Sequence, residues 1–331
     1  MPLEYAIIHL NSCKEDSPML SVIIPAYNEE DMLQKAARVI GSILSEKDIP
    51  HELIFVDDGS KDRTWELIQA QSDVQPQVRG VHFSRNFGKE AAIMAGLAEA
   101  DGDCCVVIDC DLQHPPEKIL EMYALWQQGY AIVEGRKSSR GKEDALHSIG
   151  AKGFYSLISS ATGIDMANAS DFKLLDRQAV NVLLNMRERN AFFRALSSWI
   201  GFKTTYVEFD VREREAGVTK WSPLSLAKYA VSNISSFSAA PMQIVTVLGV
   251  IMFVCSLVLG GISLAQKIMG QALEGFTTVI LLLLLSSSLI MISLGIIGYY
   301  IARIYEEIKG RPRYIVAARV KGVSHEDGKT V

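Results

Sequence analysis

The sequence predicts an α/β domain with a mainly parallel sheet, followed by two membrane-spanning helices. Short apolar runs alternate with helix-like segments over about the first two hundred residues, which is typical of a parallel sheet covered by helices on both faces. Near the C-terminal end, the stretches 244–265 and 276–302 contain no charged residue. Each is long enough to cross a hydrocarbon core of ~30 Å, whereas buried helices of soluble cores are usually shorter.

The expected strands are the apolar runs, each bounded by polar or turn-forming residues. They are 21–24, 52–56, 81–83, 104–108, 131–134 and 204–209. Helical patterns are expected at about 29–45, 61–72, 88–100, 116–128 and 143–160. In open α/β sheets ligands bind beyond the carboxyl ends of the strands. The residues that directly follow these runs are therefore the first candidates for a site.

The predicted organisation has five parts. They are an N-terminal extension (1–18), the α/β domain (19–221), an interfacial amphipathic helix (222–240), the two spans (within 241–302) and a basic tail (303–331). An ordinary surface helix is an alternative for 222–240. The tail is richer in Lys and Arg than the connector 266–275, which predicts a multi-pass inner or plasma membrane protein with both termini cytoplasmic. We expect no cleavable signal peptide in 1–18.

Charge and cysteine content exclude several classes of protein. The formal net charge is −5, so a basic nucleic-acid-binding surface is not expected. The chain has five cysteines and no Cys-x-x-Cys spacing, which argues against a disulfide framework or a zinc site.

Asp109 and Asp111 form the most informative local pattern. Residues i and i+2 of an extended segment face the same side. Two ionised carboxylates placed in this way repel each other unless a divalent cation lies between them. The alternative is a pair of solvated turn aspartates ahead of His114 and the two prolines that follow it.

Two further polar clusters follow expected strands, at 27–29 and 57–60. The second is also compatible with a simple strand-to-helix turn that contains a capping side chain. Together with Asp109 and Asp111, the clusters are expected to meet at one edge of the sheet.

Four segments together resemble the family 2 inverting glycosyltransferases, which have a GT-A fold. They are Val22-Ile-Ile-Pro-Ala-Tyr-Asn-Glu-Glu, Val56-Asp-Asp-Gly-Ser-Lys-Asp, Ser84-Arg-Asn-Phe-Gly-Lys-Glu-Ala-Ala and Asp109-Cys-Asp-Leu-Gln-His-Pro-Pro-Glu. The GT-A fold is a Rossmann-like, mainly parallel sheet with flanking helices.

The resemblance narrows to the polyprenyl-phosphate glycosyltransferases, the group of bactoprenol glucosyltransferase and dolichyl-phosphate mannose synthase. It rests on the two spans and four further segments, and it extends over about 19–315. The segments are Asn168-Ala-Ser-Asp-Phe-Lys-Leu-Leu-Asp-Arg, Arg189-Asn-Ala-Phe-Phe-Arg, Trp199-Ile-Gly-Phe and Arg214-Glu-Ala-Gly-Val-Thr-Lys-Trp.

The resemblance implies a nucleotide-sugar site. Its residues would be Pro25, Tyr27, Glu29, Asp57, Asp58, Lys89 and Asp109. Carboxylates accept hydrogen bonds from a uracil imide or ribose hydroxyls, and a tyrosine offers a stacking face. Pro25 as a strand stop and Glu29 as a helix-start acid remain alternatives.

The resemblance also implies a metal and catalytic groups. Asp109 and Asp111 would hold Mg²⁺ or Mn²⁺ on the diphosphate, with Asp111 as the direct ligand, and Gln113 would reach the sugar or the lipid phosphate. Asp171 would be the base or an orienting carboxylate; a helix N-cap is the alternative. An acceptor phosphate is already largely ionised near neutral pH, so positioning matters more than proton transfer.

Five basic residues are available for the acceptor phosphate: Lys173, Arg189, Arg212, Arg214 and Lys220. The implied activity is transfer of one sugar from a nucleotide-sugar, such as UDP-glucose, to undecaprenyl or another polyprenyl phosphate at the cytoplasmic face, for cell-envelope glycans. Related enzymes form tetramers. The alternatives are a processive polysaccharide synthase, disfavoured by two spans and no Gln-x-x-Arg-Trp motif, and a non-catalytic scaffold that binds nucleotide-sugars.

Overall fold

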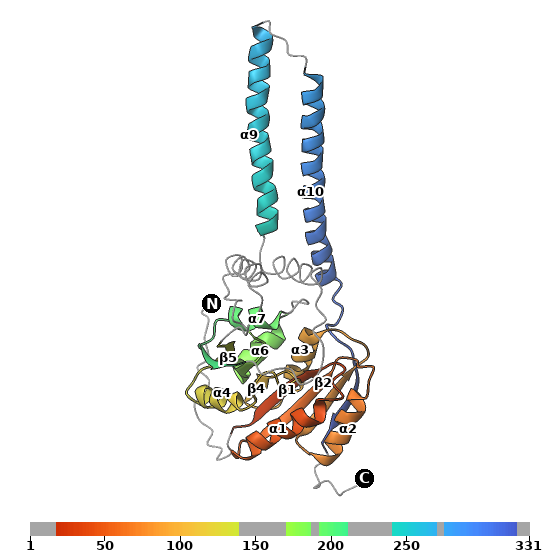
Figure 1. The fold of residues 1–331 in the computed structure, drawn as a ribbon, viewed down its shortest axis with the longest axis vertical. Coiled ribbons are helices and arrows are strands. Elements are labelled where there is room, and N and C mark those ends of the chain that lie inside the picture. The colour runs from red at the N-terminus through yellow and green to blue at the C-terminus, as the bar shows by residue number, and fades with distance from the viewer. Residues whose placement is uncertain (1–17, 139–169, 187–191, 211–239, 270–274, 323–331) are drawn as a thin grey trace, which may run out of the picture.

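The computed structural model describes residues 18–138, 170–186, 192–210, 240–269 and 275–322. Within them eight strands form one sheet in the order β7-β5-β6-β4-β1-β2-β3-β8 (Figure 1). The strands are β1 (Leu20–Ala26), β2 (His51–Asp57), β3 (Val78–Phe83), β4 (Cys104–Val107), β5 (Ile132–Lys137), β6 (Lys173–Asp176), β7 (Thr204–Phe209) and β8 (Val316–Lys321).

The sheet is mainly parallel, as predicted. β1 pairs in parallel with β2 and β4, β2 with β3, and β5 with β7. β6 runs antiparallel to both of its neighbours, β4 and β5, and β8 runs antiparallel to β3. Because β6 is reversed, its first residues lie at the same edge of the sheet as the last residues of β4.

Helices cover both faces of the sheet. α1 (Leu33–Ser45), α2 (Thr64–Val74) and α4 (Lys118–Gln127) bury apolar residues on one face, in a core that includes Val22 and Ile24. α3 (Lys89–Glu99), α6 (Arg177–Asn185) and α7 (Phe193–Trp199) bury theirs on the other face, around Ile23. Alternate residues of β1 therefore enter opposite cores, as the two-residue period of a strand requires.

Two long apolar helices extend from one end of the α/β domain (Figure 1). They are α9 (Ala240–Ile268) and α10 (Phe276–Ile308). Each contains a stretch long and apolar enough to cross a membrane, within 245–262 and 285–308, and none of either stretch is buried. Because they do not pack in the sheet's cores, the buried-helix alternative does not explain them.

The chain returns from α10 to the sheet. Tyr314 stacks on Phe83 with ring centroids 5.0 Å apart, and the Ser84 amide donates to the Ile315 carbonyl over 3.0 Å. β8 then extends the sheet next to β3. Of the expected basic tail, 303–308 thus belong to α10, and 316–321 form a strand of the α/β domain.

Five of the expected strands and four of the expected helices lie close to their predicted positions, and β7 matches its predicted range. The predictions miss the strands β6 and β8 and the helices α6 and α7. The helix expected at 143–160 and the interfacial helix expected at 222–240 lie outside the described residues.

Candidate active site

A hollow of ≈ 290 Å³ lies at the edge of the sheet where β1, β2 and β4 end. Three strand ends and the loop before α3 contribute its walls. The lining residues are Pro25, Ala26, Tyr27, Glu29, Asp58, Asn86, Gly88, Lys89, Ala92, Asp109, Cys110 and Asp111. The structure therefore brings together six of the seven residues predicted for the nucleotide-sugar, and Asp111 with them.

Asp57 is the seventh, and it lies behind the hollow. Its side chain is buried; one carboxylate oxygen accepts from the Ser60 amide at 2.9 Å, and the other lies 2.6 Å from His82 Nδ1. The bond to Ser60 is the short-range contact expected of a strand-to-helix turn. In this arrangement Asp57 shapes the loop that presents Asp58.

Asp58 joins two loops of the site. Its carboxylate accepts from the amides of Phe87 and Gly88, at 2.6 and 2.9 Å. Burial raises the pKa of Asp58, although the two amide bonds oppose this shift. Gly59 has a φ of +67°, and a Cβ at this position would meet the Arg85 backbone at 2.5 Å. Only glycine fits there without moving the loop before α3.

The segment after β1 is also fastened to the turn after β2. The Asn28 amide donates to Ser60 Oγ at 2.9 Å, and the Glu29 amide donates to Thr64 Oγ1 at 2.9 Å. Tyr27 keeps 43% of its surface exposed beside the hollow. The ring is thus held on a fixed backbone with a face available for stacking.

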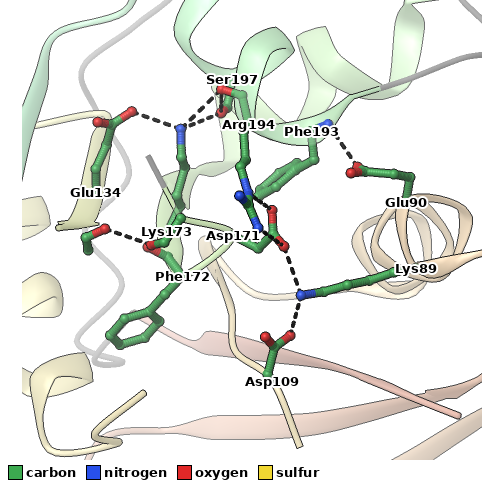
Figure 2. Close-up of polar contacts among 12 residues, drawn as sticks. Lys89, Glu90, Asp109, Glu134, Asp171, Phe172, Lys173, Phe193, Arg194 and Ser197 are labelled. Carbon is green, nitrogen blue, oxygen red and sulfur yellow. Dashed lines mark hydrogen bonds and ion pairs between the residues drawn. The ribbon is translucent and has the colours of Figure 1, made fainter. Parts of the chain in front are cut away.

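Lys89, at the first position of α3, connects two carboxylates (Figure 2). Its ammonium lies 2.6 Å from Asp109 and 2.7 Å from Asp171. Burial favours the neutral amine, but the two carboxylates outweigh this effect and raise the pKa of Lys89. The lysine is therefore a fixed positive charge between the end of β4 and the segment before β6.

Asp171 is held on its other side by Arg194 of α7 (Figure 2). Arg194 Nε donates to one carboxylate oxygen at 2.6 Å, and its terminal nitrogen donates to the other at 2.9 Å. Burial would raise the pKa of Asp171, but the charges of Lys89 and Arg194 hold it below its usual range. The helix-cap alternative for Asp171 is excluded, because 173–176 form β6 and Asp176 caps α6 by accepting from the Gln178 amide.

The charge of the hollow fits a divalent cation. Among the residues that the structure describes, Glu29, Asp58, Asp109 and Asp111 bring four carboxyl groups to its lining, and Lys89 is the single basic side chain there. Within the described ranges no group of three or more His, Cys, Asp or Glu side chains has metal-binding geometry. Mg²⁺ commonly takes one or two carboxylates and completes its shell with water and substrate phosphates. Asp109 and Asp111 fit that pattern.

Gln113 and His114 follow the two aspartates. The Gln113 amide donates to Asp111 at 3.1 Å, and its side chain is not part of the hollow's lining. His114 is buried against Phe172, with ring centroids 5.3 Å apart. Its Nδ1 lies 3.8 Å from Asp109 and has no hydrogen-bond partner among the described residues. Burial lowers the pKa of His114, which favours a neutral ring next to Asp109.

The predicted acceptor residues are only partly described. Arg189, Arg212, Arg214 and Lys220 lie outside the described residues. Lys173 is described, and its side chain is fully buried, 2.8 Å from Glu134. In this arrangement its ammonium faces the protein interior rather than a surface that a lipid phosphate reaches.

Several residues of the site were not predicted. Asn86 and Gly88 line the hollow, Arg194 binds Asp171, and Glu90 accepts from the Phe193 amide at 2.8 Å. Arg194 and Glu90 lie inside segments that carried the family resemblance, but their sequence distance from Asp171 gave no sign of contact. Arg194, for example, follows it by 23 positions.

Comparisons with known proteins identify the family of this chain. Residues 21–183 match the family model described as glycosyl transferase family 2. The chain is 39% identical over 298 residues to an uncharacterised glycosyltransferase, YkcC, of Bacillus subtilis (strain 168), with 89% of this chain and 92% of that protein covered. It is 36% identical over 304 residues to a prophage bactoprenol glucosyl transferase homologue of Escherichia coli (strain K12), with 91% and 99% covered.

Among solved structures, glucosyl-3-phosphoglycerate synthase from Mycobacterium tuberculosis, crystallised with uridine diphosphate, aligns with a TM-score of 0.46 at 19% identity. That alignment covers 66% of this chain and 79% of the synthase. The family match and the relatives that align over nearly their full length establish the family without the structural alignment. The chain belongs to glycosyl transferase family 2 and has the GT-A fold expected of it, with full-length relatives that are named bactoprenol glucosyl transferases.

Proposed function

We propose that this glycosyltransferase moves a single sugar from a UDP-sugar, with UDP-glucose the first candidate, to undecaprenyl or another polyprenyl phosphate. The observation that carries the proposal is the linked set Asp109, Lys89 and Asp171 at the rim of the acidic hollow. Asp109 and Lys89 line the hollow proposed for the donor, and Lys89 connects this hollow to Asp171. The names of relatives such as the Shigella phage SfX bactoprenol glucosyl transferase support the acceptor class and glucose.

The donor would bind with its nucleoside along the β1 and β2 ends and its diphosphate near Asp109 and Asp111. Tyr27 offers a stacking face there, and Lys89 offers a positive charge to the phosphates. Asp109 and Asp111 would hold Mg²⁺ or Mn²⁺, which when bound supplies charge neutralisation for the diphosphate.

In the proposed reaction an acceptor phosphate oxygen attacks the sugar C1 in line, the bond from C1 to the diphosphate breaks, and UDP leaves with the bonding electrons. An efficient general base has a pKa near the working pH, whereas the pKa of Asp171 is held low by Lys89 and Arg194. A phosphate acceptor is already ionised. We therefore assign Asp171 an orienting role, in which it fixes Lys89 and Arg194 beside the reacting groups.

The test uses purified full-length protein in detergent, undecaprenyl phosphate and a panel of labelled UDP-sugars. We expect transfer of one sugar per lipid, a strong preference for one donor, and loss of transfer in excess EDTA. Asp111→Asn should abolish transfer and keep the melting temperature. Asp73→Asn, an exposed aspartate on α2, is the matched control and should retain activity.

Each rival has its own outcome in the same assay. Lipid products that carry several sugars indicate a processive synthase, and donor binding without turnover indicates a scaffold. Full activity in EDTA, or in Asp111→Asn, contradicts the metal assignment.

We also propose that α9 and α10 span the membrane, with the α/β domain and both termini in the cytoplasm. The absence of buried residues in the two apolar stretches supports this, as does the position of β8, which follows α10 and joins the same sheet as β1. In a cysteine-free background, Gln271→Cys should react with an impermeant maleimide added outside the cell. Lys61→Cys and Lys329→Cys should react only after lysis, and the reverse pattern refutes the orientation.

A further inference from the structure

A buried ion pair includes Lys173, which lies two residues beyond Asp171. Lys173 and Glu134 are direct neighbours across β6 and β5, and the ammonium lies 2.8 Å from a Glu134 carboxylate oxygen. The exposed fractions of the two side chains are 0% and 9%. Burial lowers the pKa of Lys173, and Glu134 opposes this shift. Such pairs stabilise a fold little in comparison with apolar packing, so their presence calls for another reason.

The pair is hydrogen-bonded to α7 (Figure 2). Lys173 Nζ donates to Ser197 Oγ at 2.8 Å and to the Arg194 carbonyl at 3.3 Å. Ser198 Oγ donates to Glu134 at 3.2 Å. Two strands thus hold one face of the helix through charge-assisted hydrogen bonds, which are stronger than neutral ones.

The start of α7 is held from a second direction. The Phe193 amide donates to Glu90 of α3 at 2.8 Å (Figure 2). A helix of seven residues is too short to be stable alone. Its position therefore depends on these contacts and on the packing of Phe193 and Leu196 into the core.

Helix α7 places the Arg194 side chain next to Asp171. Its two hydrogen bonds fix both the place and the rotation of the Asp171 carboxylate. Lys173 lies two residues beyond Asp171 and binds the Arg194 backbone, so a closed loop runs from Asp171 through Lys173 and Arg194 back to Asp171. A shift of α7 would move the guanidinium from the carboxylate that it orients.

We propose that Glu134 and Lys173 are positioning residues for the transfer reaction: they fix α7 so that Arg194 holds Asp171 in its reactive orientation. The inference rests on the proposed function, in which Asp171 acts at the transfer centre. It replaces the expectation from sequence that Lys173 binds the acceptor phosphate.

The central experiment compares Lys173→Met with the double variant Glu134→Gln/Lys173→Met. The single variant leaves the buried Glu134 carboxylate with the longer contact to Arg136, at 3.7 Å, in place of the Lys173 ammonium, so it should lose both stability and kcat. The double variant removes both buried charges and leaves Arg136, whose side chain is 34% exposed, to solvent, so it should recover most of the melting temperature. Its kcat should stay at least tenfold below wild type, with the KM for the UDP-sugar within about twofold. A double variant with wild-type kcat overturns the proposal, because the pair is then structural only.

A mutant cycle tests whether the effect passes through Arg194. In an Arg194→Ala background the double substitution should lower kcat by less than about threefold, because the group that it positions is already absent. A full tenfold loss in that background overturns the proposal. Arg79→Met is the matched control: it breaks a pair with Glu52 at the opposite edge of the sheet, 2.6 Å apart, and should leave kcat unchanged.

Hydrogen exchange gives a readout that needs no turnover. In Glu134→Gln/Lys173→Met, amides of 193–199 should exchange faster than in wild type, whereas those of β1 and β2 should not change. Unchanged exchange in α7 overturns the inference. Wild-type protein that transfers no sugar to polyprenyl phosphate instead contradicts the proposed function, so the two failures are distinguishable.

Discussion

The parallel strands begin at one side of the sheet, the amino edge, and end at the opposite side, the carboxyl edge. Both edges contain buried carboxylates, but these carboxylates are neutralised in different ways. At the amino edge, Glu52 accepts from Ser21 Oγ at 2.6 Å and the Asp101 amide at 2.7 Å, and it pairs with Arg79 at 2.6 Å. These groups satisfy one another within the chain. The cluster ties the start of β1 and β2 to β3 and to the turn before β4.

At the carboxyl edge, the carboxylates form two layers that differ in how their negative charge is neutralised. Asp171 lies in the inner layer, where Lys89 and Arg194 hold it. In the outer layer, the lining of the hollow brings four carboxyl groups together with one ammonium. The comparison indicates that a charge cluster that is complete in itself stabilises the fold, whereas one with excess negative charge around a hollow is suited to a cationic or metal-bound ligand.

The largest expected contrast comes from neutralising one buried carboxylate at each edge. Asp171→Asn should lower kcat by roughly ten- to 150-fold, because the amide loses charge-assisted contacts with Lys89 and Arg194 worth about 1.5–3 kcal/mol and no longer orients them. Glu52→Gln should lower the melting temperature while the folded fraction keeps its kcat. Steady-state kinetics with thermal unfolding measures both. If Asp171→Asn keeps more than a tenth of wild-type kcat, the carboxyl edge does not have the role given to it.

Arg79→Met isolates the structural side of the comparison. Loss of the charged hydrogen bond should lower the free energy of unfolding by roughly 2–3 kcal/mol, since Glu52 is left buried. Denaturant unfolding measures this loss. The KM for the UDP-sugar should not change, because the substitution lies at the opposite ends of the strands. A raised KM would show that the two edges are coupled.

Much of the carboxyl edge could be predicted from the sequence. Apolar runs that end in polar residues predicted the parallel strands and their shared edge, and six of the seven nucleotide-sugar candidates line one hollow. This succeeds because parallel strands that alternate with helices must end on the same side. Asp57 differs because its carboxylate is used by Ser60 and His82.

What sequence reasoning missed depends on long-range pairing. β6 has four residues with a charged residue at each end, so it shows no apolar run. β8 is an edge strand with basic residues, which resembles a solvated tail. The reversal of β6 is what brings Asp171 to the end of β4. Without that pairing, neither the contact of Arg194 with Asp171 nor the burial of Lys173 was visible.

Gly59→Ala tests how tightly the loops of the carboxyl edge are joined. The φ of +67° costs an alanine about 1 kcal/mol, and its Cβ would press on the Arg85 backbone. We expect the KM for the UDP-sugar to rise about fivefold, measured at saturating acceptor. Gly129→Ala is the matched control, because its φ is +88° but nothing lies within 4 Å of the added Cβ. Equal KM values for the two variants would show that strain alone, not the loop contact, matters.

The smallest expected effect on catalysis concerns Glu90, which holds the start of α7 at the carboxyl edge. Burial, and then the charge of Asp171, raises its pKa from about 4.5 to about 7, while the Phe193 amide, Arg194 and Lys89 oppose this shift. The folded state therefore retains a proton that the unfolded state has released. Its contribution to stability is present at pH 4.5 and below, and it is lost as the pH rises to about 7.

Glu90→Gln keeps an acceptor for the Phe193 amide but has no titrating group. Between pH 5 and 8, the unfolding free energy of wild type should therefore fall relative to that of Glu90→Gln by roughly 2–3 kcal/mol, since about two units of the pKa shift lie in this window and each corresponds to about 1.4 kcal/mol. Urea unfolding at four pH values measures the difference. Parallel curves for the two proteins would mean that Glu90 is ionised in the fold throughout. Its bond to Phe193 would then be a charged contact, of the kind that Glu52 makes at the amino edge.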